Sequence, residues 1–64
     1  MTKYKINENK DVEILEEGKV VSKYSYKEVI ENAIEYYAAA GKNLSEKQLE
    51  NMEYISLVED TLEI

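Results

Sequence analysis

Residues 25–41 read SYKEVIENAIEYYAAAG, and this stretch contains the start, the body and the end of one helix. Ser25 and Glu28 have the spacing of a capping box, in which each side chain binds the backbone N–H of the other residue. Between them and Gly41, apolar side chains recur three and four residues apart, so they fall within one stripe of a helix. Gly41 is the expected left-handed residue after the helix end. The stretch predicts an amphipathic helix over about residues 26–40.

The same local pattern repeats further along the chain. Ser45 and Gln48 have the spacing of a second capping box, which predicts a helix over about residues 46–59. The connection between the two helices is short, so we expect them to be antiparallel neighbours. The inner face of the second helix is expected to contain Leu49, Met52, Ile55 and Val58, with Leu62 beyond its expected end as a further candidate.

Upstream of the helices the periodicity changes from helical to alternating. In residues 3–7, Tyr4 and Ile6 alternate with lysines, as in a strand with one buried face. Two more strands are predicted over about residues 11–16 and 19–24. The glycine at position 18 between them indicates a hairpin turn.

Two registers of this hairpin can be weighed from the sequence. A two-residue loop at Glu17-Gly18 would pair Leu15 with Val20, whereas a loop one residue longer would pair Ile14 with Val20. The longer loop is preferred because it gathers apolar side chains on one face of the sheet. It leaves Leu15 and Val21 on the outer face. The expected inner set is Val12, Ile14, Val20 and Tyr24.

These elements predict an α+β fold in one domain over residues 1–64. A small three-stranded antiparallel sheet (β-β-β) is followed by two antiparallel amphipathic helices packed on one sheet face. The chain has 64 residues and contains no proline, so neither a second domain nor a linker is expected.

The composition excludes several classes of function. The chain has no Cys, His or Arg, which removes disulfides and the usual ligands of zinc. Acid–base chemistry would depend on carboxylates with perturbed pKa values, but the paired carboxylates fall on the solvated faces of the helices. We therefore expect no catalytic residue, no metal site and no cofactor.

The charge and hydropathy pattern also limits location and partners. No apolar run approaches the roughly 20 residues that span a bilayer, and no secretory signal pattern is present, so a cytoplasmic protein without membrane contact is expected. The net charge is −6. A protein of this charge, without arginine, is expected not to bind nucleic acid directly.

The charges are unevenly distributed along the chain. Residues 1–27 carry six lysines and five acids, while residues 28–64 carry two lysines and nine acids. Carboxylates one turn apart on two helices would form a negative surface that a basic partner could recognise. Simple solubility explains the same residues, because glutamate favours both helices and surfaces. The candidate partner-binding residues are Glu28, Glu31, Glu35, Tyr36, Glu46, Glu50, Glu53, Tyr54 and Leu57.

Two hypotheses follow from these observations. The first is a non-catalytic module that binds and inhibits a larger protein, including a basic nucleic-acid-handling protein by negative-charge mimicry. In composition the chain is similar to small acidic proteins encoded by phages and mobile elements, which implies a host cytoplasm and a host partner. The alternative is a structural or regulatory homodimer that associates through Leu15 and Val21 on the outer sheet face, or through a strand edge.

Overall fold

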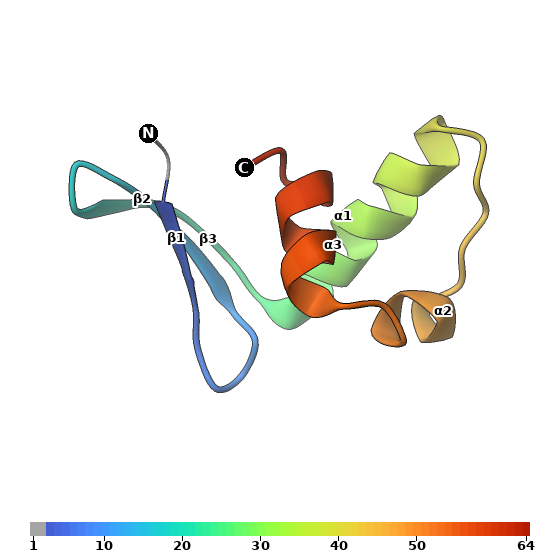
Figure 1. The fold of residues 1–64 in the computed structure, drawn as a ribbon, viewed down its shortest axis with the longest axis horizontal. Coiled ribbons are helices and arrows are strands. Elements are labelled where there is room, and N and C mark those ends of the chain that lie inside the picture. The colour runs from blue at the N-terminus through green and yellow to red at the C-terminus, as the bar shows by residue number, and fades with distance from the viewer. Residues whose placement is uncertain (1–2) are drawn as a thin grey trace.

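A computed structural model describes residues 3–64, and it shows a three-stranded antiparallel sheet followed by three helices (Figure 1). The expected α+β class is therefore confirmed. The sheet order is β1-β2-β3. The elements are β1 (Lys3–Ile6), β2 (Val12–Glu16), β3 (Lys19–Tyr24), α1 (Tyr26–Ala39), α2 (Glu46–Glu50) and α3 (Tyr54–Thr61).

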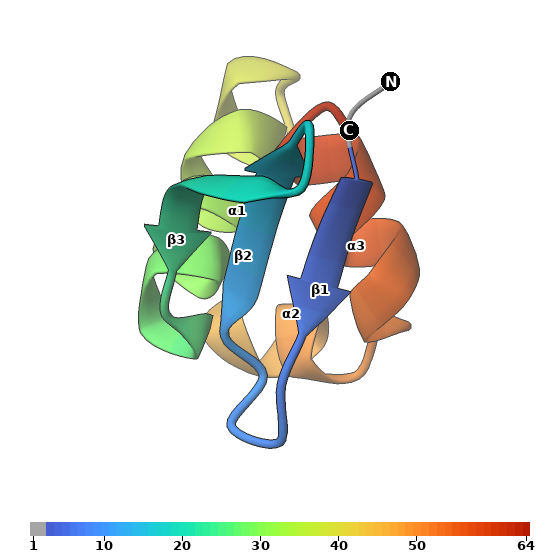
Figure 2. The same ribbon diagram turned by 90° about the vertical axis from the view of Figure 1, so that its left-hand side faces the viewer.

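The sheet forms one layer, and the helices lie on one of its two faces. Figure 2 shows the three strands in front of the helices, with no element over their outer face. Val12 of β2, Val29 of α1 and Val58 of α3 are fully buried together between the two layers. Burial of these side chains removes apolar surface from water and holds the sheet against the helices.

A second cluster joins the helices to one another. It contains Ile30 and Ala33 of α1, Leu49 of α2 and Leu57 of α3. Partly buried aromatic and aliphatic side chains surround this cluster. The apolar core thus continues beyond the sheet and depends on all three helices.

The hairpin between β2 and β3 has the shorter of the two loops considered. Leu15 pairs with Val20, and both loop residues have positive φ, 52° for Glu17 and 79° for Gly18. Two such residues are typical of a type I′ turn, whose twist matches that of the flanking strands. The preferred three-residue loop is therefore wrong.

A β-bulge follows this turn and sets the faces of the sheet. The register shifts, so that Ile14 pairs with Ser22 and Val12 pairs with Tyr24. Val12 is completely buried as expected, but Val20 is 52% exposed. The predicted inner position of Val20 is wrong because the shorter loop pairs it with Leu15 on the outer face, and the bulge then brings Ser22 and Tyr24 opposite Ile14 and Val12.

Both predicted capping boxes are confirmed. The Ser25 hydroxyl accepts a hydrogen bond from the Glu28 backbone N–H (3.2 Å), and the Glu28 carboxylate accepts one from the Ser25 N–H (3.1 Å). Ser45 and Gln48 form the same pair of bonds at the start of α2. Each box satisfies two backbone donors that the first helical turn would otherwise leave without a partner.

The end of α1 also matches its prediction. Gly41 has φ of 83°, and the Lys42 N–H donates to the Tyr37 carbonyl over 2.8 Å. A second bond runs from the Gly41 N–H to the Ala38 carbonyl. These two bonds define a Schellman motif, in which glycine takes the left-handed position at no steric cost.

The second predicted helix, over residues 46–59, is wrong as a single element. The structure contains two shorter helices, with a break at residues 51–53. The expected inner residues lie three positions apart, and each such step falls about 60° short of a full helical turn. After three steps the side chains would face opposite sides, so a straight helix could not bury them all. The break keeps Leu49 buried and leaves Met52 and Ile55 exposed.

The break also changes the direction of the last helix. The Tyr26 and Tyr54 rings, at the starts of α1 and α3, lie 5.5 Å apart, and Asn32 of α1 donates to the Thr61 carbonyl. In both views α1 and α3 rise in the same direction (Figures 1 and 2). The predicted antiparallel pair is wrong because α2 and the break return the chain to the start of α1.

Candidate interaction site

Three of the predicted acidic residues come together on α1. A shallow hollow on the surface is lined by residues from the end of β3 and from α1 only: Tyr24, Glu28, Glu31, Asn32 and Glu35. The three carboxylates are exposed, and the lining contains no lysine. This hollow combines negative charge with an aromatic ring and an amide, which is suited to binding a cationic group.

The position of α1 explains why this hollow is accessible. Val29 of α1 packs against the sheet. With about 100° of rotation per residue, Glu31 and Glu35 lie about 200° and 240° around the helix from Val29. Their carboxylates therefore lie on the side of α1 that is turned away from the sheet.

Glu28 has a structural role in addition to its place in the hollow. Its carboxylate accepts the backbone N–H of Ser25 and completes the capping box of α1. A negative side chain in the first turn also interacts favourably with the helix dipole. Substitution of Glu28 would thus change stability as well as surface charge.

The acids of α2 lie at a different place. Glu46 and Glu50 are exposed on α2. Burial raises the pKa of Tyr26, and the negative charges of Glu50 and Glu46 raise it further, so both carboxylates are near this ring. Because neither residue lines the α1 hollow, the predicted acids of α1 and α2 form two separate groups.

Tyr54 belongs to an aromatic cluster at the start of α3. Its hydroxyl donates to the Lys10 carbonyl over 2.6 Å, and its ring lies 5.5 Å from that of Tyr26. The Lys10 Nζ lies 5.3 Å and 5.9 Å from the centroids of the Tyr26 and Tyr54 rings, within range of a cation–π interaction. Burial, followed by the neighbouring Tyr26 and Asp11, raises the pKa of Tyr54 to about 12. These contacts join the turn between β1 and β2 to the helices.

The remaining predicted contact residues have different environments. Leu57 is completely buried in the helical cluster, so its predicted position beside the acidic surface is wrong. Tyr36 is 39% exposed and meets the Tyr37 ring edge-on at 5.3 Å. Glu53 is exposed at the start of α3, where its carboxylate accepts the Ser56 hydroxyl.

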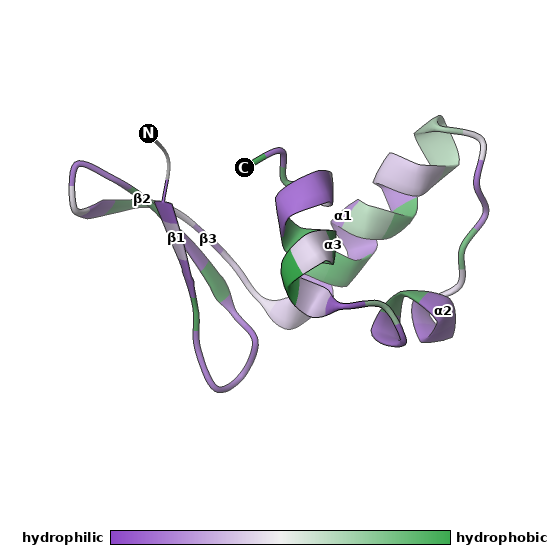
Figure 3. Ribbon diagram, viewed as in Figure 1, coloured by the Kyte–Doolittle hydropathy of each residue, from purple (hydrophilic) through white to green (hydrophobic). Residues whose placement is uncertain are grey.

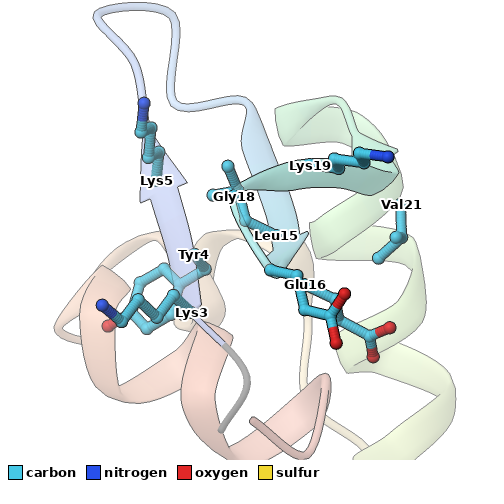
Figure 4. A pocket seen from close by; sticks show the side chains of 9 residues that line it. Lys3, Tyr4, Lys5, Leu15, Glu16, Gly18, Lys19 and Val21 are labelled. Atoms are coloured by element: carbon cyan, nitrogen blue, oxygen red, sulfur yellow. The ribbon is translucent and has the colours of Figure 1, made fainter.

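The outer sheet face contains the residues predicted for self-association. Leu15 and Val21 line one open hollow together with Lys3, Lys5 and Lys19, as Figure 4 shows. Two glutamates at the hairpin turn complete its polar rim. This hollow is apolar at its centre and mixed in charge around it.

Two exposed apolar residues lie at the corner between α2 and α3, where the sequence pattern predicted core positions. Met52 is 38% exposed and Ile55 is 51% exposed, although both were expected in the core. The signal was present in the three-residue spacing from Leu49 to Val58, which rotates steadily around a helix instead of following one face. Most of the α2 ribbon is coloured as hydrophilic (Figure 3).

The described residues, 3–64, also limit the kinds of site that this part of the chain can form. Within residues 3–64, no group of three or more Asp or Glu side chains is arranged to hold a metal ion. Every buried side-chain nitrogen or oxygen in this range has a hydrogen-bond partner. No helix in the same range has the length and apolar character needed to cross a bilayer.

Comparison with known proteins adds no further constraint: no protein-family model, no curated protein and no solved structure matches this chain. Its function must therefore be argued from its own residues.

Proposed function

We propose that this protein is a non-catalytic interaction module that binds a basic surface of a larger protein and inhibits it. The contact uses the acidic residues of the helical half. The finer version of the proposal is a cytoplasmic, phage-type inhibitor that occupies the cleft of a nucleic-acid-handling protein in place of the nucleic acid.

One observation carries this proposal. Glu31 and Glu35 lie on the side of α1 away from the sheet, in a hollow that they share with Glu28 and that contains no lysine. Carboxylates in such an arrangement create a local negative potential, which steers a positively charged partner toward them. Because these charges are solvated, their attraction is expected to weaken as salt shortens the screening length.

A charge reversal with a matched control tests the proposal. The double variant Glu31→Lys/Glu35→Lys raises the net charge by four units and changes only the α1 surface. Glu8→Lys/Glu17→Lys makes the same change in net charge at the two turns of the sheet. We expect the first variant to lose a partner that the wild-type protein retains from an extract of its own cells, and the second to keep it.

Salt and nucleic acid provide the deciding comparisons. A partner that stays bound at high salt, or that both variants lose equally, would contradict the acidic-surface proposal. Competition with duplex DNA separates the finer version from the general one. A nucleic-acid-handling partner should be displaced by DNA, whereas a partner with an unrelated basic surface should not.

A second candidate, a homodimer through the outer sheet face, is favoured by the hollow that contains Leu15 and Val21. Sedimentation equilibrium of the wild-type protein and of Val21→Lys tests it. A concentration-dependent dimer that Val21→Lys dissociates would support this candidate. A wild-type protein that stays monomeric at high micromolar concentration would reject it.

A further inference from the structure

The corner between α2 and α3 contains two exposed apolar side chains. Met52 lies in the break between the helices, and Ile55 lies in the first turn of α3 three residues later. Their exposed fractions, 38% and 51%, contrast with complete burial of Leu57 and Val58 in the same helix. A single exposed apolar side chain is common, but two within four residues at one corner offer apolar area that a partner can cover.

Carboxylates surround this apolar pair along the chain. Glu50 precedes it, Glu53 lies between its two members, and Glu59 follows one turn after Ile55 on the same side of α3. The Glu59 carboxylate is held by the Tyr4 hydroxyl, which donates to it over 3.2 Å. Glu53 is held in a similar way by the hydroxyl of Ser56.

Two lysines belong to the elements around this corner, Lys47 on α2 and Lys10 in the turn between β1 and β2. The Lys10 ammonium is placed over the rings of Tyr26 and Tyr54, on the flank of α3 that packs toward the β1–β2 turn. The chain at this corner therefore carries three carboxylates close in sequence to the apolar pair, against Lys47 of α2 and the Lys10 ammonium on one flank. This charge balance favours a cationic partner over an anionic one.

We infer that Met52 and Ile55 form the apolar centre of a docking surface for a basic partner segment, in which apolar side chains lie between lysines or arginines. This inference rests on the proposed function and assigns a specific place to it. Protein interfaces commonly combine an apolar centre that loses water with a charged rim. Methionine suits such a centre because its flexible side chain adapts to the shape of a partner.

The charges select this occupant over a second copy of the chain. A symmetric contact through the same corner would bring Glu50, Glu53 and Glu59 of both copies together. Like charges at an interface are strongly unfavourable. An amphipathic basic segment instead places cations opposite these carboxylates while its apolar side chains cover Ile55.

A synthetic helical peptide of lysine and leucine, with leucines three and four residues apart, is a direct probe of this surface. Its affinity is measured by fluorescence anisotropy for wild-type protein, Ile55→Ser and Val20→Ser. Val20 is the matched control, because it is 52% exposed and lies on the sheet, away from the corner. We expect Ile55→Ser to weaken binding by about tenfold and Val20→Ser to leave it unchanged.

We expect circular dichroism to show that both variants are folded, because both substituted side chains are exposed. Equal weakening by the two serine substitutions, an unchanged affinity of Ile55→Ser, or no binding of the peptide would each overturn the inference. The proposed function is judged separately. If the wild-type protein and Ile55→Ser retain the same salt-sensitive partner from cell extract and Glu31→Lys/Glu35→Lys does not, the acidic module stands and the corner is rejected.

Discussion

Replacement of Leu57 by alanine tests the arrangement of the last two helices directly. A single helix over residues 46–59 would place Ile55 in the core and Leu57 outside it. The structure has the opposite arrangement, with Leu57 at 0% exposure and Ile55 at 51%. Alanine substitutions at these two positions should therefore have unequal effects on the free energy of unfolding, and the order identifies the correct arrangement.

The magnitudes follow from burial. Leu57→Ala removes three carbon atoms from a fully buried site, which costs about 2.4 kcal/mol at roughly 0.8 kcal/mol for each methylene. The space left among Ile30, Ala33 and Leu49 raises the total to about 3 kcal/mol. Ile55→Ala removes a side chain that is already half in water and leaves no enclosed space, so its cost should be about 1 kcal/mol.

Urea unfolding followed by circular dichroism measures both values. A domain of this length has a total stability of about 3–10 kcal/mol, so Leu57→Ala should remove a large part of it. The corresponding fall in melting temperature is about 12–24 °C. A cost for Leu57→Ala below that of Ile55→Ala would refute the split helix and restore the continuous one.

Three further substitutions test local features. Glu17→Asn should raise the free energy of unfolding, measured by thermal unfolding, by about 1 kcal/mol, because asparagine tolerates the positive φ of this turn position. A loss of stability would argue against the two-residue turn. Ser25→Ala should lower the free energy of unfolding by about 1 kcal/mol, because the helix loses its cap. This loss should be smaller when Glu28 is already replaced by alanine. Additive losses in the double variant would contradict the capping box. Tyr54→Phe should cost about 1 kcal/mol at neutral pH by removing the bond to the Lys10 carbonyl. Burial raises the pKa of Tyr54 from 10.0 to about 12 in the folded state. The stability that the neutral hydroxyl contributes is therefore complete below pH 10.0 and is lost as the pH rises toward 12. Tyr54→Phe should flatten this fall in stability at alkaline pH.

Local sequence signals predicted the parts of the fold that depend on neighbouring residues. The capping boxes at Ser25 and Ser45 and the glycine at the end of α1 involve partners within a few positions, and all three are present. The alternation of Tyr4 and Ile6 likewise placed β1 correctly. In each of these cases the chemistry that fixes the element lies within the segment itself.

The predictions of the hairpin register and of the second helix were wrong, because both features depend on which residues pack into the core. The register of the hairpin depends on the two-residue loop and on the bulge in the first half of β3, which together pair Val12 with Tyr24 instead of with Ser22. The break at residues 51–53 depends on whether Leu57 or Ile55 reaches α1. Both choices are made by tertiary packing, which overrides the local pattern.

For the acidic residues, exposure could be predicted from the sequence, but their arrangement in space could not. The exposure of Glu31 and Glu35 could be predicted, because both lie opposite the apolar stripe of α1. Their separation from Glu46 and Glu50 could not, because it depends on the path that the chain follows between α1 and α2. The negative surface predicted across two helices is replaced by separate groups of carboxylates on α1 and α2.

The break in the second helix connects the fold to the proposed docking surface. Tyr54, Leu57, Val58 and Thr61 follow one helical stripe, and they can face α1 and the sheet only if α3 begins anew after residue 53. The same rotation necessarily turns Ile55 outward and leaves Met52 in the break. Polar residues at these two positions would satisfy the core equally well, because neither side chain is enclosed in it. Packing therefore explains why the two positions are exposed but not why their side chains are apolar, and the proposed partner segment would account for that second property.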